Sequence, residues 1–236
     1  MGAEVGASSH GAAGPKLEMS IAADRRQHVL ERIAKAASRA RREPADMQLL
    51  AVTKGRSAEQ IEQLIAAGQR DFGENRVQEA LGKWPELRRH HPGIRLHGIG
   101  RLQSNKAVDA IRLFDVIHSV DRASLLDALV KEASRTGKFP PVYVQVNIGE
   151  EEQKGGCAIS DVGQLIEAVR ASPLPLAGLM AIPPLGLEPA PYFALLAKIA
   201  RRHDVKGLSI GMSGEYEAAV MLGATVVRVG SALFED

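Results

Sequence analysis

The sequence predicts an α/β protein folded as a single (β/α)8 barrel of the TIM type. From residue 49 onward, eight short runs rich in β-branched residues alternate with amphipathic segments. Seven of these runs are followed by a helical pattern, and a further amphipathic segment precedes the first run. Eight successive βα units favour a closed parallel barrel. An open doubly wound sheet is the alternative that the same alternation allows.

The expected strands are short, mostly apolar runs that end in polar or glycine residues, as strands of a parallel sheet do. They cover residues 49–54, 71–75, 95–100, 116–121, 142–147, 176–182, 207–212 and 225–230.

Two of the helices expected between these strands have recognisable ends. Ser57 and Gln60 have the spacing of a capping box, and Gly68 follows the last apolar position of that helix. Asp121 is expected to cap a later helix that ends at Gly137.

The two ends of the chain differ from the repeating part. Residues 1–18 are rich in Gly, Ala and Ser without periodicity, which predicts a flexible extension before a barrel domain at 19–236. The chain stops six residues after Gly230, so we expect no helix after the eighth strand. An amphipathic helix at 23–42 is expected to supply the missing outer layer.

The composition excludes several classes of protein. The net charge is only +2 and 4% of residues are aromatic, with no basic block, so nucleic acid is not an expected partner. No apolar run approaches the roughly 18 residues of a membrane span. The single cysteine, Cys157, rules out an internal disulfide and favours a cytoplasmic protein. No surplus apolar stripe marks an oligomer interface, which favours a monomer.

Polar residues at the ends of the first three strands are candidates for ligand contacts, because barrels bind ligands there. Lys54 ends the first strand, where partial desolvation would lower the pKa of its amine and favour attack on a carbonyl. A lysine that emerges into solvent is the alternative. Asn75 ends the second strand. His97, in the third, would line the barrel mouth or be a hydrogen-bonded structural residue.

The last two units carry a candidate phosphate site. Ser213 and Gly214 follow the seventh strand, and Gly230 and Ser231 follow the eighth. Hydroxyls and free N–H groups at these two positions of a barrel commonly bind phosphate. Each motif alone is a weak signal, because glycine and serine also fill ordinary turns.

One ligand that carries both an aldehyde and a phosphate, pyridoxal 5′-phosphate (PLP), satisfies the lysine and the phosphate site together. Arg228 alternates onto the inward face of its strand. An arginine that donates to the pyridine nitrogen would make the ring a poorer electron sink. An arginine paired with a carboxylate at the rim is the alternative. A barrel that binds another phosphorylated metabolite without covalent attachment also stays open.

Five segments in order resemble one known family. They are AVTK, FGENRVQE, HGIGRLQSNK, GLMAIPP and LSIGMSGEYEAAVMLGATVVRVGSALF, within residues 23–234. Together they resemble the YggS/PROSC family of PLP homeostasis proteins. The resemblance implies a barrel like the N-terminal domain of alanine racemase, with PLP held on Lys54 as a Schiff base.

The resemblance also implies roles for the other candidates. Ser213, Gly214, Gly230 and Ser231 would contact the phosphate, Arg228 would lie near the pyridine nitrogen, and Asn75 and His97 would lie beside the cofactor. Relatives often have threonine at Ser231 and a polar residue at Gly214, which puts only a side-chain contact at Gly214 in doubt.

Two activities are compatible with this resemblance. The first is a non-catalytic carrier that holds PLP and supplies it to apoenzymes. The second is an amino-acid racemase, which needs a base on each face of the substrate carbon. Enzymes of the alanine racemase type take the second base from an additional C-terminal domain, and this chain ends at the barrel. The sequence therefore favours the carrier.

Overall fold

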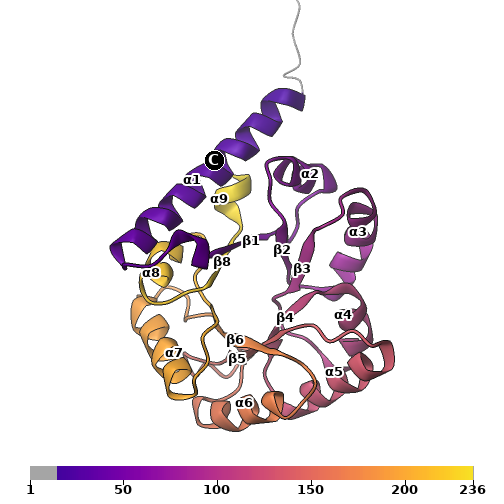
Figure 1. Ribbon diagram of the computed structural model, residues 1–236, viewed down its shortest axis with the longest axis vertical. Helices are drawn as coiled ribbons and strands as arrows, with labels where there is room; N and C mark the ends of the chain where they lie inside the picture. Colours follow the sequence, from indigo (N-terminus) through magenta and orange to yellow (C-terminus); the bar gives the residue numbers. More distant parts are fainter. Residues whose placement is uncertain (1–14, 236) are drawn as a thin grey trace, which may run out of the picture.

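The computed structural model describes residues 15–235, with side chains from residue 21 onward. Its eight strands are all parallel and close into a barrel in chain order, with β1 beside β8 (Figure 1). They are β1 (Gln48–Val52), β2 (Asp71–Glu74), β3 (Arg95–Gly98), β4 (Val116–Val120), β5 (Val142–Val146), β6 (Leu176–Ala181), β7 (Leu208–Ser209) and β8 (Val226–Val229). The predicted barrel is confirmed, and the open sheet is excluded.

Helices surround the barrel on the outside (Figure 1). They are α1 (Pro15–Arg39), α2 (Ala58–Ala66), α3 (Val77–His90), α4 (Ala107–Leu113), α5 (Ala123–Thr136), α6 (Val162–Arg170), α7 (Ala190–Arg202), α8 (Tyr216–Met221) and α9 (Ser231–Phe234). Three short 3₁₀ helices are η1 (Pro44–Asp46), η2 (Ser104–Lys106) and η3 (Ile159–Asp161).

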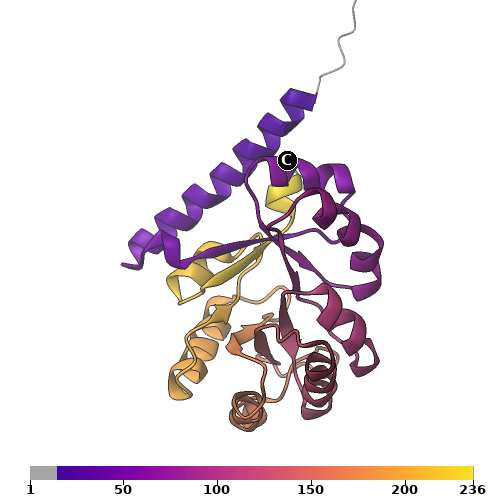
Figure 2. The same ribbon diagram turned by 45° about the vertical axis from the view of Figure 1, so that its right-hand side comes forward.

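The long helix α1 lies along the outside of the barrel and packs against α2, α8 and α9 (Figure 2). It supplies the outer layer next to β8, as predicted. It starts at Pro15, inside the range expected for the extension. Residues 1–14 of that range lie outside the described residues. The expectation that no helix follows β8 is wrong, because α9 needs only four residues for its single turn.

The helix ends test the capping predictions. The capping box is confirmed: Ser57 Oγ accepts from the Gln60 N–H, and Gln60 Oε1 accepts from the Ser57 N–H. Gly137 ends α5 in the left-handed conformation, with φ 71°. Asp121 does not cap α5. Its carboxylate turns instead to the Arg122 side chain and to the N–H of Gly156 in the loop after β5.

The core has two parts, one between the strands and the helices and one inside the barrel. The inner part contains a small apolar cluster that includes Leu50, Tyr143, Met180 and Val226. Barrel interiors are normally filled by branched apolar residues. This one also buries the polar side chains of His97, His118, Ser209 and Arg228.

Candidate functional site

A cavity of about 570 Å³ opens at the C-terminal ends of the strands, within the usual size range of small-molecule sites. Seven of the eight residues that the sequence singled out line it. They are Lys54, Asn75, Ser213, Gly214, Arg228, Gly230 and Ser231. The sequence therefore located the cavity, and the structure brings together residues from four βα units.

Lys54 lies two residues beyond the end of β1 and projects into this cavity region with its side chain exposed. The partial desolvation that we expected is therefore not found in this structure. Within the described part of the chain, the Lys54 amine has no hydrogen-bond or ion-pair partner. No described protein group therefore competes with a ligand for the Lys54 amine.

The residue before Lys54 is fixed by a buried carboxylate. Thr53 and Glu74 are both fully buried, and Thr53 Oγ1 donates to Glu74 Oε1 at 2.6 Å. Trp84 Nε1 donates to the same oxygen at 2.9 Å. The carboxylate therefore joins the ends of β1 and β2 to the helix α3.

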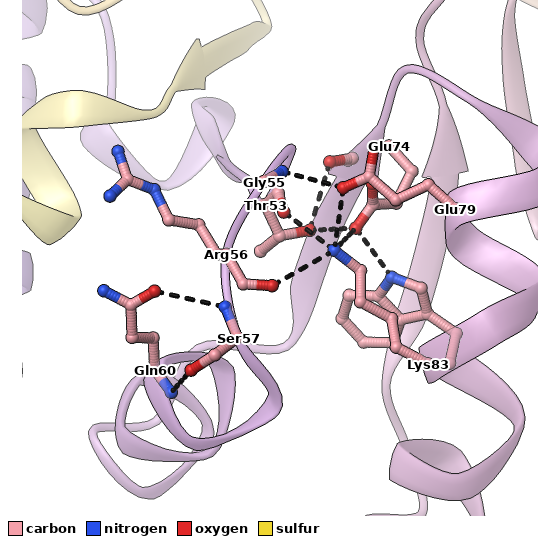
Figure 3. Close-up of polar contacts among 10 residues, drawn as sticks. Thr53, Gly55, Arg56, Ser57, Gln60, Glu74, Glu79 and Lys83 are labelled. Carbon is pink, nitrogen blue, oxygen red and sulfur yellow. Dashed lines mark hydrogen bonds and ion pairs between the residues drawn. The ribbon is translucent and has the colours of Figure 1, made fainter.

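Lys83 of α3 bonds to the carbonyl oxygens of Thr53 and Arg56, in the loop that follows β1 (Figure 3). Its Nζ lies 2.8 Å from both the Thr53 carbonyl oxygen and Glu74 Oε1, and 3.4 Å from Glu79 Oε1. Glu79 also accepts the Gly55 N–H at 2.7 Å, which is the main cause of its lowered pKa. Sequence reasoning missed this network, because its link between α3 and the end of β1 exists only in the folded barrel.

The candidate phosphate site begins two residues beyond β7, where the chain turns sharply at Gly211, which has φ 89°. A Cβ there would lie 2.5 Å from Ala219 Cβ, so only glycine allows this turn to pack on α8. In the part of the chain that the structure describes, the N–H groups of Ser213 and Gly214 have no acceptor. They can donate to an anion.

The loop after β8 completes this region. The Gly230 N–H, which we expected to be free for a ligand, donates to Ser213 Oγ at 3.0 Å. A Cβ at Gly214 would meet nothing within 4 Å, and one at Gly230 would only touch Val52 at 3.7 Å. The protein itself therefore leaves space above both glycines, as a phosphate cradle requires.

Arg228 points inward, as the alternation predicts, and is only 3% exposed. Its Nη1 donates to the carbonyl and hydroxyl oxygens of Ser209 at 2.5 and 2.8 Å, and its Nη2 donates to the Ala181 carbonyl at 2.9 Å. Burial lowers its pKa to about 10, so the guanidinium stays charged at neutral pH. Among the described residues no carboxylate forms an ion pair with it, which excludes the alternative of a paired rim arginine.

His97 is not at the mouth, and this prediction is corrected. Its ring is 2% exposed inside the barrel, with Nδ1 3.0 Å from His118 Nε2 and Nε2 3.3 Å from Asp71 Oδ1. Asp71 starts β2 at the opposite end of the barrel. Ile99, two residues after His97, takes the place at the cavity. The structural alternative for His97 is therefore the one that the contacts support.

Four polar residues that sequence reasoning did not select also line the cavity: Arg56, Arg101, Gln145 and Glu215. Gln145 of β5 is 5% exposed, and its Oε1 has no partner in the described structure. Its inward position could have been found from the alternation of Val142–Val146. Glu215 also lines the cavity, and burial raises the pKa of its carboxyl.

The opposite end of the barrel has a larger opening, of about 680 Å³. Its lining includes Arg26, Arg70 and Arg95 but none of the residues predicted to bind a ligand. The mouth cavity is therefore the candidate site, although it is the smaller of the two.

Comparison with known proteins agrees with the fold. The sequence model of the family described as "Alanine racemase, N-terminal domain" matches residues 25–236. A pyridoxal phosphate homeostasis protein of Pseudomonas aeruginosa is 43% identical over 224 residues, which cover 92% of this chain and 96% of the relative. The chain therefore belongs to the alanine racemase N-terminal domain family, among the relatives named pyridoxal phosphate homeostasis protein.

Solved structures extend the comparison. PipY of Synechococcus elongatus PCC7942 with PLP bound is 38% identical, with a TM-score of 0.74, and the match covers 86% of this chain and 99% of PipY. An alanine racemase of Corynebacterium glutamicum is 16% identical, with a TM-score of 0.64, over 91% of this chain and 61% of the racemase. The second likeness shows the shared fold alone.

No helix within residues 15–235 is both long enough and apolar enough to cross a bilayer.

Proposed function

We propose that this chain binds PLP on Lys54 and acts in PLP homeostasis, holding the cofactor and supplying it to apoenzymes. One observation carries the proposal: an unpaired lysine amine, unused N–H donors and a buried guanidinium line the same cavity. PLP has an aldehyde that forms a Schiff base with a lysine, a phosphate and a basic ring nitrogen. The names of the relatives, and the PLP-bound structure of PipY, support the same ligand.

The residues fit each part of PLP in turn. Ser213, Gly214 and Ser231 offer N–H and hydroxyl donors to the phosphate. Arg228 offers a donor to the ring nitrogen, because its Nε N–H has no acceptor in the described part of the chain. The amide of Gln145, with its unpaired buried oxygen, faces the same space and could bond a polar ring substituent.

The residues of the cavity support a PLP carrier better than a racemase. An arginine that is charged at neutral pH and donates to the ring nitrogen would restrain carbanion chemistry. Lys54 supplies one base, and the described cavity lining contains no histidine, tyrosine or cysteine as a second. Its one carboxylate, Glu215, follows Ser213 and Gly214, on the side of the candidate phosphate site. Tyr143 stacks on His118 with ring centroids 4.2 Å apart, deeper in the barrel. Exchange of the α-hydrogen of L-amino acids in deuterated buffer at enzymatic rates would favour the racemase instead.

We also propose that delivery involves contact with the receiving apoenzyme at this end of the barrel. Leu185 is 94% exposed and Leu187 is 57% exposed on the loop after β6, at the same end as the cavity. Exposed leucines at the cavity end of the barrel are suited to contact a partner. We further propose a cytoplasmic monomer, consistent with a single buried thiol at Cys157.

The proposal is tested by transfer. The protein is loaded with PLP, separated from free PLP, and mixed with an apo PLP-dependent enzyme whose recovery of activity is followed. A carrier activates the apoenzyme and loses its bound PLP in equal amount. A Leu185→Ser/Leu187→Ser variant should bind PLP normally but transfer it no faster than PLP dissociates. If PLP never leaves the loaded wild-type protein, the carrier function is wrong.

A further inference from the structure

A continuous line of hydrogen bonds crosses the interior of the barrel from the mouth to the opposite end. Arg228 Nη1 donates to Ser209 Oγ at 2.8 Å, and that oxygen lies 2.9 Å from His118 Nδ1. His118 Nε2 lies 3.0 Å from His97 Nδ1, and His97 Nε2 lies 3.3 Å from Asp71 Oδ1. Strands β8, β7, β4, β3 and β2 each contribute one residue.

The line has a cation at one end and an anion at the other. Burial would raise the pKa of Asp71, but hydrogen bonds from His97 and Arg95 outweigh it and hold the pKa below its usual value. Burial, together with His97 and Arg228, holds the pKa of His118 well below its usual value, so that ring is neutral. The line therefore connects the guanidinium at the mouth to a carboxylate at the N-terminal end of the strands.

For a neutral His97, the protons can be assigned in only one way. The Asp71 carboxylate can only accept, so His97 carries its proton on Nε2 and accepts on Nδ1. His118 then donates from Nε2 and accepts on Nδ1. The Ser209 hydroxyl must donate to His118, which turns its lone pairs toward Arg228. In this assignment, every donor in the line points from Arg228 toward Asp71, and such chains strengthen their members.

The neighbours of the line leave its members little freedom. His97, His118 and Ser209 are each no more than 2% exposed. The His118 ring is stacked on Tyr143 with an interplanar angle of 16°. At the far end, Arg95 Nε holds Asp71 Oδ1 at 2.7 Å. A buried arginine surrounded by apolar residues alone would have no such defined orientation.

We propose that Ser209, His118, His97 and Asp71 are positioning residues that orient Arg228 toward the ring nitrogen of PLP. The proposal rests on the function proposed above and deepens it. Ser209 acts directly, since its carbonyl and hydroxyl oxygens both bind Nη1 and so fix the plane of the guanidinium. His118, His97 and Asp71 act through Ser209. Each accepts a hydrogen bond from its neighbour on the Arg228 side of the line and so fixes which atom of that neighbour donates.

The chain offers a matched pair of variants. Ser209→Ala and Ser119→Ala each remove a serine hydroxyl from a buried site, where Ser209 is 0% exposed and Ser119 is 1% exposed. Ser119 Oγ has no hydrogen-bond partner in the described structure and is not part of the line. A third variant, His118→Phe, keeps the stacking on Tyr143 and removes both ring nitrogens. A fourth, Asp71→Asn, changes the partly exposed far end and should disturb folding least.

The readout is the ¹⁵N NMR signal of the pyridine nitrogen in PLP labelled at that atom and bound to each protein. We expect Ser209→Ala and His118→Phe to move this signal toward that of a pyridine without a hydrogen-bond donor. Asp71→Asn should move it less, in the same direction, and Ser119→Ala should leave it unchanged. PLP should dissociate about tenfold faster from Ser209→Ala and His118→Phe, as for one lost charged hydrogen bond.

The outcomes separate the two proposals. A wild-type protein that binds no PLP would overturn the proposed function and this inference with it. A wild-type protein that binds PLP, with unchanged signals in Ser209→Ala, His118→Phe and Asp71→Asn, would overturn only the positioning role. An equal shift in Ser119→Ala would also overturn it, because the effect would then come from any change in the core. If the two buried variants fail to fold, Asp71→Asn decides alone.

Discussion

Thr53 donates its hydroxyl hydrogen to Glu74 at 2.6 Å, and these two buried residues immediately precede Lys54 and Asn75. The bond ties the end of β1 to the end of β2 directly below the mouth of the barrel. Two of the residues proposed to contact PLP therefore start from one rigid point. The backbone that leads into Lys54 is therefore anchored, while the side chain of Lys54 is exposed.

Thr53→Val keeps the shape of the side chain and removes the donor to Glu74. We expect a loss of about 1–3 kcal/mol in the free energy of unfolding, because a buried carboxylate oxygen loses a hydrogen bond. PLP should also attach to Lys54 more slowly. Urea unfolding and stopped-flow absorbance measure the two effects. Thr136→Val, at the partly buried end of α5, is the control and should cost less. Equal stability and attachment rate in Thr53→Val would contradict this role.

Lys83→Met should be more damaging than Thr53→Val, because it leaves the fully buried Glu74 without its cation. Removal of one partner of a buried ion pair typically costs about 3–5 kcal/mol. Combining it with Glu74→Gln removes the unpaired charge, so the double variant should be less unstable than the sum of the single variants. A double-variant cycle by urea unfolding tests this. Additive costs would show that Lys83 and Glu74 are not coupled.

Gly214→Ala tests the phosphate cradle. A methyl group at Gly214 meets no protein atom within 4 Å, and the φ of this residue is not left-handed, so the fold should tolerate it. It would occupy space proposed for the phosphate, and PLP should bind about tenfold more weakly or worse. Equilibrium binding and thermal unfolding are measured together. Gly82→Ala on α3 also adds a methyl group into open space and should leave PLP binding unchanged. Unchanged affinity in Gly214→Ala would place the phosphate elsewhere.

Cys157 should be unreactive in the folded protein. Burial, with a smaller effect of Asp121, raises the pKa of its thiol from 9.0 to about 12, so the thiolate fraction falls about a thousandfold at pH 8. Iodoacetamide should therefore label it much more slowly in the native protein than in urea. The folded thiol holds its proton longer than the unfolded one, so its contribution to stability is lost as pH rises from about 9 to about 12. Equal labelling rates with and without urea would contradict the burial.

The sequence was sufficient for the barrel because each βα unit shows its own periodicity. It overestimated the length of β7, which is only Leu208–Ser209. The strand ends early because Gly211 turns against Ala219, and this contact exists only after α8 has packed. Helix α9 was missed because four residues give no periodic pattern.

The candidate site was predictable where position in a βα unit decides it, as for Lys54, Ser213 and Arg228. Alternation showed that His97 faces inward but not how deep it lies. Inward residues form layers, and His97 belongs to the layer below Ile99, away from the cavity. The prediction that Lys54 is partly desolvated was wrong for a related reason. The alternation of residues does not show where a strand ends, and β1 ends at Val52, two residues before Lys54. The support by Lys83 depends on a contact from a neighbouring helix and has no local signal.

The central claim is that the amine of Lys54 holds PLP. The direct measurement is borohydride reduction of the PLP-saturated protein followed by mass spectrometry of its peptides, with Lys206→Ala as a control at the opposite end of the barrel. The account predicts a single pyridoxyl-phosphate adduct on Lys54 in the wild type and in Lys206→Ala, and none in Lys54→Ala. An adduct on another lysine, or a PLP-saturated wild type without any adduct, would contradict it.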